Sequence, residues 1–178
     1  DDGSEPHHHA AYQQLRQEIN AKQPLQWHTL EVSLHGHGPS FSRNLGALHA
    51  QGEFLCFLDD DDSWADSHHL HRAANVLQQS HADVYLSNQT AFREDKAVDD
   101  GLWLADLARQ VNVTHRALIE GTYPVSIDEL MQINGFSHLN TTVVSRTLYM
   151  NIDGFDESLR YEEDRDFYYR LLDHANLI

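Results

Sequence analysis

Residues 54–64 read Phe-Leu-Cys-Phe-Leu-Asp-Asp-Asp-Asp-Ser-Trp, a short apolar run that ends in four consecutive aspartates. The apolar part is continuous and follows Gly52, which is typical of a strand buried on both faces, as in a parallel sheet. Such a strand brings the residues after it to the carboxyl edge of the sheet, where open α/β folds bind their ligands. The sequence therefore predicts an α/β fold with an acidic site at that edge.

Four carboxylates gathered in one place repel one another. Two like charges about 4 Å apart cost roughly 4 kcal/mol at an effective dielectric constant near 20. A divalent cation removes that cost, and Mg²⁺ or Mn²⁺ favours carboxylate oxygens while leaving positions for water and substrate phosphates. Acidic runs are more often solvated loops or helix N-termini. The position of this run behind a buried strand and ahead of Trp64 nevertheless favours a metal and phosphate site.

Composition narrows the class of protein. The chain has 178 residues, of which 40% are hydrophobic and 22% charged, as expected for one globular domain with a real core. Its 28 acidic residues against 12 basic ones give a formal net charge of −16. This charge argues against nucleic acid or an anionic membrane surface as the main partner. No apolar stretch approaches the ~20 residues that span a bilayer.

The cysteine and histidine content adds no metal site of its own. The single cysteine, Cys56, falls inside the apolar strand and is expected to be an inert core thiol. Of the 14 histidines, several cluster at 7–9 and 68–71, but neither a Cys pair nor a His-Glu-x-x-His spacing accompanies them. We interpret these clusters as solvated surface.

Helix and strand patterns alternate through the first half, which favours a layered α/β structure. The expected elements are a helix over 6–20, a strand over 25–34, a helix from Pro39 that Gly52 would cap, a helix opened by Asp66 or Ser67, and a strand over 83–87. In the helix after Pro39, we expect Phe41, Leu45 and Leu48 to share the buried face and Arg43 and Asn44 to point away.

The second half is mixed. The expected elements are a polar loop over 90–100, a short helix over 104–111, an aperiodic stretch over 112–125, a helix from a capping box at Ser126 to near Gly135, a strand over 141–144, a short helix capped by Ser145, and a helix after Glu162-Glu163-Asp164. The chain begins on a turn and ends on what looks like the start of a strand. We therefore expect a single domain that is incomplete at both ends.

Five motifs stand in a recognisable order across nearly the whole chain. They are Asp1-Asp2-Gly3-Ser4, Ser42-Arg43-Asn44-Leu45-Gly46, residues 52–64, Gly154-Phe155-Asp156-Glu157, and Glu163-Asp164 with Arg170-Leu171. Each is weak alone, but together they resemble family 2 glycosyltransferases of the GT-A fold. The usual opening of that family, an apolar strand ending in a Pro-Thr-Tyr-Asn-like turn, is absent.

The resemblance implies a GT-A Rossmann-like three-layer sandwich with a mixed, mainly parallel central sheet. Residues from 1 to about 90 would form the nucleotide-sugar-binding half. Residues from about 91 to 178 would form the half that binds the acceptor and holds the catalytic base, with Asn44 and Gly46 shaping the close approach of their helix to the sheet.

The same resemblance implies an inverting transferase that uses a nucleotide-diphosphate sugar, most often a UDP-sugar, and a glycan or lipid-linked acceptor. Asp1 and Asp2 would lie near the nucleobase and ribose, and Arg43 would reach the nucleotide unless it is an ordinary surface arginine. Asp59 would face the ribose. Asp61 would contact the metal, Mn²⁺ or Mg²⁺, and the diphosphate, with Asp62 as a further ligand of the metal.

The general base would be Asp164, because an acceptor hydroxyl needs a carboxylate within hydrogen-bond reach to take its proton. A helix N-terminus favoured by its dipole is the ordinary alternative for Glu163 and Asp164. Weaker assignments place Glu163, Trp64, Asn140 and Thr141 at the sugar or acceptor, although Trp64 equally suits core packing and the other two could open a strand. The family's usual location is cytoplasmic, at times peripheral at the inner membrane face.

Two other classes remain open from sequence. A sugar-nucleotide pyrophosphorylase also combines an α/β domain, Mg²⁺ and carboxylates, but its Gly-rich loop is not found in this chain. A non-catalytic module that binds a metal or nucleotide would need the acidic run but not Asp164. A processive synthase would carry transmembrane helices and a Gln-x-x-Arg-Trp motif, and neither is present.

Overall fold

The computed structural model describes residues 2, 6–20, 25–31, 33, 36–94, 96–98, 103–133 and 135–176. Its helices are η1 (Pro6–His8), α1 (His9–Asn20), α2 (Pro39–His49), α3 (His69–Ser80), α4 (Ala105–Thr114), α5 (Ile127–Gln132), η2 (Leu139–Thr141), α6 (Arg146–Asn151) and α7 (Glu163–His174). Its strands are β1 (Phe54–Cys56), β2 (Val84–Leu86), β3 (Ala91–Arg93), β4 (Lys96–Val98) and β5 (Thr142–Ser145).

The central sheet has three strands in the order β1-β5-β2. Leu55 pairs with Val144, and Val84 pairs with the same residue from the other side. Both pairings are antiparallel, so β1 and β2 run in the same direction with β5 reversed between them. The expected sheet was mixed and mainly parallel, whereas the described pairings of this sheet are all antiparallel.

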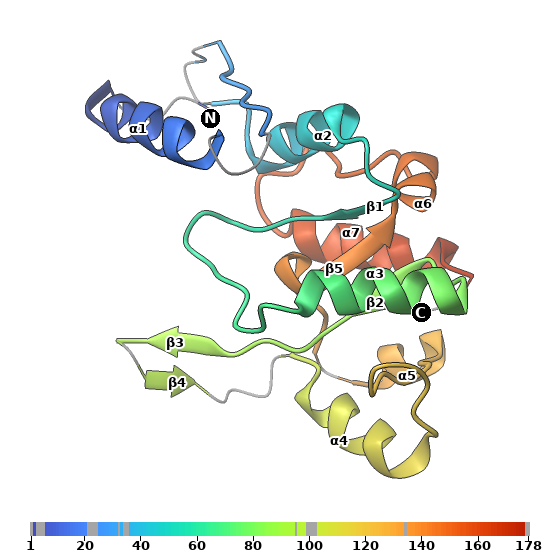
Figure 1. The fold of residues 1–178 in the computed structure, drawn as a ribbon. Helices are drawn as coiled ribbons and strands as arrows, with labels where there is room; N and C mark the ends of the chain where they lie inside the picture. Colours follow the sequence, from blue (N-terminus) through green and yellow to red (C-terminus); the bar gives the residue numbers. More distant parts are fainter. Residues whose placement is uncertain are drawn as a thin grey trace.

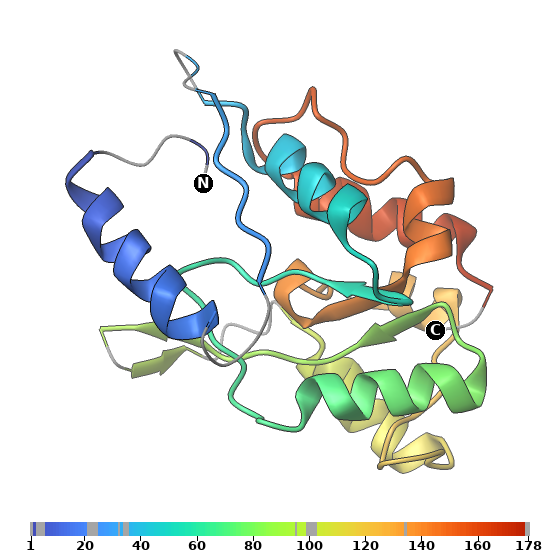
Figure 2. The same ribbon diagram turned by 45° about the horizontal axis from the view of Figure 1, so that its top comes forward.

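Helices cover both faces of this sheet, which gives the three layers (Figures 1 and 2). On one face, Leu55, Val84 and Val144 join a core with α2, α6 and α7. On the other face, Tyr85 and Val143 pack against α3. Successive strand residues thus serve opposite layers, as the pleat requires. A further apolar cluster joins α4, α5 and α7, below the sheet in Figure 1.

Three expected elements differ from the structure. The described residues between 25 and 33 form no strand, and 90–100 is not a plain loop, because β3 and β4 pair as an antiparallel hairpin that projects beside the acidic loop (Figure 1). Helix α2 ends at His49 with Ala50 as its cap, so Gly52 is not the C-cap. Its neighbour β1 is fully buried only at Leu55, while Phe54 and Cys56 are half-buried.

The orientation of α2 is the main correction. Leu48 is 64% exposed, whereas Ser40 and Ala47 are buried. Arg43 and Asn44 lie on the same face as these two, at the i, i+3, i+4 and i+7 spacing of one helix side, and face the body of the domain. The inward face of α2 is therefore its polar face, and Gly46 is exposed with open space around it rather than pressed on the sheet.

Among the described residues, no helix is both long and apolar enough to cross a membrane.

Candidate functional site

The acidic residues form a turn directly after β1. The amide of Asp62 donates to the carbonyl of Asp59 at 3.2 Å. Asp59 is half-buried, and Asp60, Asp61 and Asp62 are exposed. We call residues 59–62 the acidic loop.

Asn140, just ahead of β5, holds this loop at the same end of the sheet, because β5 starts beside the end of β1. Its side-chain oxygen accepts from the backbone N–H of Asp59 at 3.1 Å, and its side-chain nitrogen donates to a carboxylate oxygen of Asp62. Its own carbonyl accepts from the indole N–H of Trp64 at 2.8 Å. Asn140 is 4% exposed, so its amide is committed to shaping the acidic loop. Thr141, also buried, donates its hydroxyl to the carbonyl of His138.

Arg43 connects the acidic loop to the start of α7. One guanidinium nitrogen donates to Asp59 at 2.8 Å and another donates to Glu163 at 2.7 Å. The group lies 5.5 Å from the centre of the Phe155 ring. Burial lowers the pKa of Arg43, but the hydrogen bonds to the two carboxylates outweigh burial and raise its pKa above the usual value. Arg43 is thus an internal ion-pair residue rather than an exposed one.

Asn44, next to Arg43, fastens the turn that contains Gly154. Its side-chain oxygen accepts from the hydroxyl of Tyr149 at 2.6 Å and from the N–H of Phe155 at 2.9 Å, while its nitrogen donates to the Phe155 carbonyl. Gly154 has φ +61°, and a Cβ there would meet the Asn44 oxygen at 2.5 Å. The glycine is required both by its backbone conformation and by this close approach.

The N-terminus of α7 carries the candidate base. Asp164 lies in the first turn with its side chain 21% exposed, and it accepts from the N–H of Arg165 at 2.8 Å. Its second oxygen lies 3.8 Å from Nε2 of His138. Glu163, by contrast, is occupied by Arg43. Of this pair, Asp164 is therefore the carboxylate that Arg43 does not bind.

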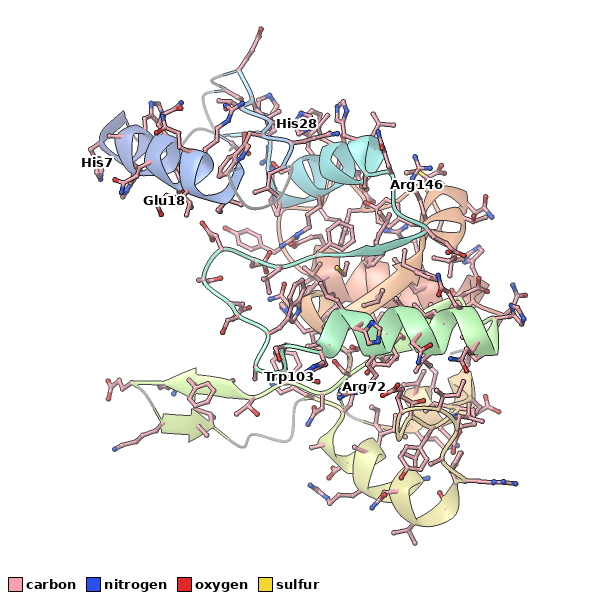
Figure 3. All side chains as sticks on the ribbon, viewed as in Figure 1. His7, Glu18, His28, Arg72, Trp103 and Arg146 are labelled. Carbon is pink, nitrogen blue, oxygen red and sulfur yellow. The ribbon has the colours of Figure 1, made fainter. Side chains whose placement is uncertain are left out.

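Two hollows lie on either side of the acidic loop. The first, of about 640 Å³, is lined by Asp61, Asp62 and Trp64, and also by Asn140 and Thr141. Its remaining lining includes Arg72, Tyr85 and Phe92, which sequence reasoning did not single out. It also includes His69, which is buried, although the histidine cluster at 68–71 was expected to be solvated surface. Arg72 is labelled on α3 in Figure 3 and forms an ion pair with Asp66 at 2.6 Å. This hollow brings together the metal candidates and three of the weakly assigned sugar contacts, Trp64, Asn140 and Thr141, but not Glu163.

The second hollow, of about 410 Å³, lies toward α1. It is lined by Asp2, Asp60, Tyr12, Arg16 and Trp27, with three further residues. Two aromatic side chains and an arginine suit a flat, anion-bearing ligand. Asp60 thus faces one hollow and its neighbour Asp61 the other, so a ligand reaching from one to the other would cross the acidic loop.

Asp2 is tied to the turn ahead of α2, and Asp1 lies outside the described residues. The carboxylate of Asp2 accepts from the N–H groups of His37 and Gly38 at 2.8 and 2.9 Å, and pairs with Nδ1 of His37 at 2.8 Å. Burial tends to raise the pKa of Asp2, but these hydrogen bonds outweigh it and hold the pKa below the usual value. Asp2 is therefore ionised and positioned at the edge of the second hollow.

The described residues provide two carboxylates for a cation, those of Asp61 and Asp62, rather than a complete cage. Among them, no group of three or more His, Cys, Asp or Glu side chains is arranged to hold a metal ion. Asp61 and Asp62 line one hollow, and Asn140 orients Asp62. Mg²⁺ and Mn²⁺ sites of this kind use one or two carboxylates and take further oxygens from substrate phosphates and water. The donor set fits such a shared site.

Comparisons with known proteins identify relatives of this chain. Relatives include the succinoglycan biosynthesis protein ExoW of Rhizobium meliloti (strain 1021), which is 30% identical over 121 residues, covering 65% of this chain and 36% of that protein. The crystal structure of S. aureus TarS matches all of this chain and 28% of its own, with a TM-score of 0.68 and 23% identity. A structure of TarS 1–349 in complex with UDP covers 93% of this chain and 43% of its own, with a TM-score of 0.63 and 24% identity.

The chain thus spans less than half the length of each of these proteins, and the structural matches show a shared fold of the GT-A type. The family model described as "Glycosyltransferase like family 2" matches residues 17–178, which is most of the chain. With the acidic loop and the acidic start of α7 in place, this match shows that the chain belongs to glycosyltransferase family 2.

Proposed function

We propose that this chain forms the donor-binding and catalytic part of a transferase that moves a sugar from a nucleotide-diphosphate donor to a hydroxyl group and inverts the anomeric centre. The observation that carries the proposal is the linkage of two acidic elements far apart in the sequence. Arg43 joins Asp59 of the acidic loop to Glu163, the residue next to Asp164. The acidic loop with its metal candidates and the start of α7 with its candidate base are therefore linked through Arg43.

The donor would lie across the acidic loop. The hollow beside Tyr12 and Trp27 offers aromatic faces to a nucleobase, and the hollow beside Trp64 has room for a sugar. A diphosphate that joins them would pass the aspartates of the loop. UDP is the favoured nucleotide because a TarS structure that shares this fold contains UDP.

Asp61 and Asp62 would hold a divalent cation, Mn²⁺ or Mg²⁺, together with the diphosphate. When bound, the cation supplies positive charge to the departing diphosphate. Asn140 keeps Asp62 in place before any ligand arrives, because its buried amide already donates to that carboxylate. Arg43 likewise fixes Asp59, so the loop is organised in advance and little reorganisation is needed during the reaction.

Asp164 would act as the general base. It takes the proton of an acceptor hydroxyl while the oxygen forms its bond to the anomeric carbon and the bond to the diphosphate breaks. Attack from the side opposite the leaving group inverts the centre. The proton ends on Asp164 and the electron pair of the broken bond stays with the nucleotide diphosphate.

The acceptor would be a glycan or a lipid-linked sugar that enters beside the β3–β4 hairpin. Phe92 of this hairpin is 69% exposed and lines the larger hollow, which offers an aromatic surface to a sugar ring. A lipid-linked acceptor would place the protein at the inner membrane face as a peripheral protein, and a glycan acceptor would leave it in the cytoplasm.

The first test is a calorimetric titration of the protein with UDP, GDP and dTDP, each with and without Mn²⁺. We expect one nucleotide, UDP, to bind tightly only when Mn²⁺ is present. Binding of none of them by folded protein would overturn the donor assignment. Reaction of a nucleoside triphosphate with a sugar 1-phosphate, which forms a nucleotide sugar and releases pyrophosphate from the triphosphate, would favour a pyrophosphorylase instead.

The second test separates an enzyme from a binding module. Asp164→Asn is expected to leave the affinity for UDP and Mn²⁺ unchanged and to lower the rate of UDP release from UDP-sugars by 100-fold or more, the usual range for a general base. Asp173→Asn, at the exposed far end of the same helix, is the matched control and should keep full activity. Equal activity of both variants would remove Asp164 from the mechanism.

A further inference from the structure

His138 is a histidine that sequence reasoning did not single out, and it lies beside the candidate base. It is the N-cap of η2 and immediately precedes the residues that hold the acidic loop. Its side chain and that of Asp164 are 20% and 21% exposed, so both are largely shielded from water. The nearest atoms of the pair, Nε2 and Oδ2, are 3.8 Å apart.

The backbone of His138 is fixed by several hydrogen bonds. Its carbonyl accepts from the N–H and the hydroxyl of Thr141 and from the hydroxyl of Thr142, each at 3.0 Å. The imidazole meets the Trp103 ring edge-on at 5.6 Å between centroids, and Trp103 is labelled in Figure 3. The ring therefore has little freedom to turn away from α7.

The tautomer of the ring follows from its other nitrogen. Nδ1 accepts the backbone N–H of Asn140 at 3.3 Å. A ring nitrogen that accepts a hydrogen bond carries no proton, so the neutral imidazole has its proton on Nε2. That proton is on the side of Asp164.

We propose that His138 is a positioning residue for the general base: its Nε2–H donates to Oδ2 of Asp164 and orients the carboxylate toward the acceptor hydroxyl. The inference rests on the proposed function, because it assigns a partner to the base of that reaction. The separation of 3.8 Å is longer than a hydrogen bond, and contacts of this kind tighten when substrate closes the site. Oδ1 already accepts from Arg165 N–H, so the second contact fixes the plane of the carboxylate.

The same short segment would then serve both ends of the reaction. His138 lies beside the candidate base, and Asn140, two residues later, contacts the acidic loop through Asp62. The N–H of Asn140 that sets the tautomer of His138 belongs to the residue that shapes the acidic loop. This arrangement is a specific reason for a histidine here, since a residue that only capped η2 would need no Nε2–H.

Two substitutions separate the capping role from the positioning role. His138→Asn keeps an oxygen where Nδ1 lies and is a good N-cap, but it has no atom that reaches Asp164. His138→Gln places a nitrogen donor at the same number of bonds from Cα as Nε2 and caps less well. The readouts are kcat and donor KM for UDP release from a UDP-sugar with Mn²⁺, the affinity for UDP, and the melting temperature.

We expect His138→Asn to lower kcat about tenfold, the effect of losing one hydrogen bond to a charged group. Its donor KM, UDP affinity and melting temperature should match the wild type, and His138→Gln should regain most of kcat. Wild-type kcat in His138→Asn, or an equal loss in both variants, would overturn the positioning role while leaving the transferase intact.

A measurement that needs no turnover completes the test. The ¹⁵N chemical shifts of the His138 ring in the folded protein should show a protonated Nε2 and a bare Nδ1, and the opposite tautomer would overturn the inference. Wild-type protein that binds UDP but releases none from any UDP-sugar would instead refute the proposed function, and with it the role of His138.

Discussion

The ion pair at Arg43 offers the sharpest test of how the site is held together. The substitution is Arg43→Met, which keeps the length and apolar bulk of the side chain and removes its charge. It leaves Asp59 and Glu163 without the guanidinium that now donates to both at 2.8 and 2.7 Å. The side chains of Arg43 and Glu163 are only 16% and 13% exposed, so water replaces the lost partner poorly.

The expected cost follows from that burial. Removing one partner of a buried ion pair costs about 3–5 kcal/mol, because a charge is left uncompensated. Asp59 is 32% exposed, so its carboxylate regains part of its hydration and the lower end, about 3 kcal/mol, applies. For a domain of this size, that corresponds to a fall of roughly 6–12 °C in melting temperature.

Urea unfolding followed by circular dichroism measures this change. Arg165→Met is the control, because Arg165 pairs with Glu162 on the surface, where the two side chains are 48% and 66% exposed, and exposed pairs contribute about 0–1 kcal/mol. Adding Glu163→Gln to Arg43→Met should recover part of the loss, since one stranded charge is removed. If Arg43→Met were as stable as Arg165→Met, the claim that this ion pair joins the acidic loop to α7 would be wrong.

Two further predictions concern the loop and a helix cap. Asn140→Leu should weaken Mn²⁺ binding in the presence of UDP by about tenfold or more, because residues that support metal ligands typically have effects of that size. Calorimetry measures the affinity, and Asn88→Leu in the same hollow is the control. Equal Mn²⁺ affinities of the two variants would show that Asn140 does not have this role. The pKa of Glu129 is held below 4.5, first by the hydrogen bond from the N–H of Ser126 and then by its hydroxyl, so the stability it adds is present above pH 4.5 and lost as the pH falls through the lowered pKa. Glu129→Gln should therefore be less stable than wild type by about 0.5 kcal/mol at pH 7 and equal to it in acid, once Glu129 is protonated in the folded protein. A difference in unfolding free energy that persists when this carboxyl is protonated would contradict this account.

The sequence predicts best where a local interaction decides the structure. Ser126 and Glu129 form the expected capping box, and the side chain of Ser145 caps α6. The apolar run ahead of the aspartates forms β1 and delivers the acidic loop to the edge of the sheet. Each of these depends on residues within a few positions of one another, so propensity and spacing suffice.

The errors arise where distant residues decide. Hydrophobic periodicity assigns Leu48 to the buried side of α2, but Arg43 and Asn44 face inward because their partners, Glu163 and Phe155, lie far along the chain. From sequence alone, a polar helix face is predicted to be exposed to solvent, because its distant hydrogen-bond partners are not known. The β3–β4 hairpin was missed for a similar reason, since its alternation spans only a few residues and its exposed Phe92 packs in no core cluster.

Polar residues that face inward therefore have a common explanation in this molecule. A helix stabilised only by packing would bury Leu48 and expose Arg43, at no cost in desolvated charge. The chain instead half-buries Arg43 and Asn44 of α2 and buries the amide of Asn140, and these groups form hydrogen bonds with the acidic loop, the Gly154 turn or α7. Apolar contacts alone would let these loops shift by small amounts at little cost, whereas directional hydrogen bonds fix where each carboxylate points. A site made of loops needs such polar side chains on the inward faces of α2 and η2, because they hold Asp62 and Asp164 in position before the substrate arrives.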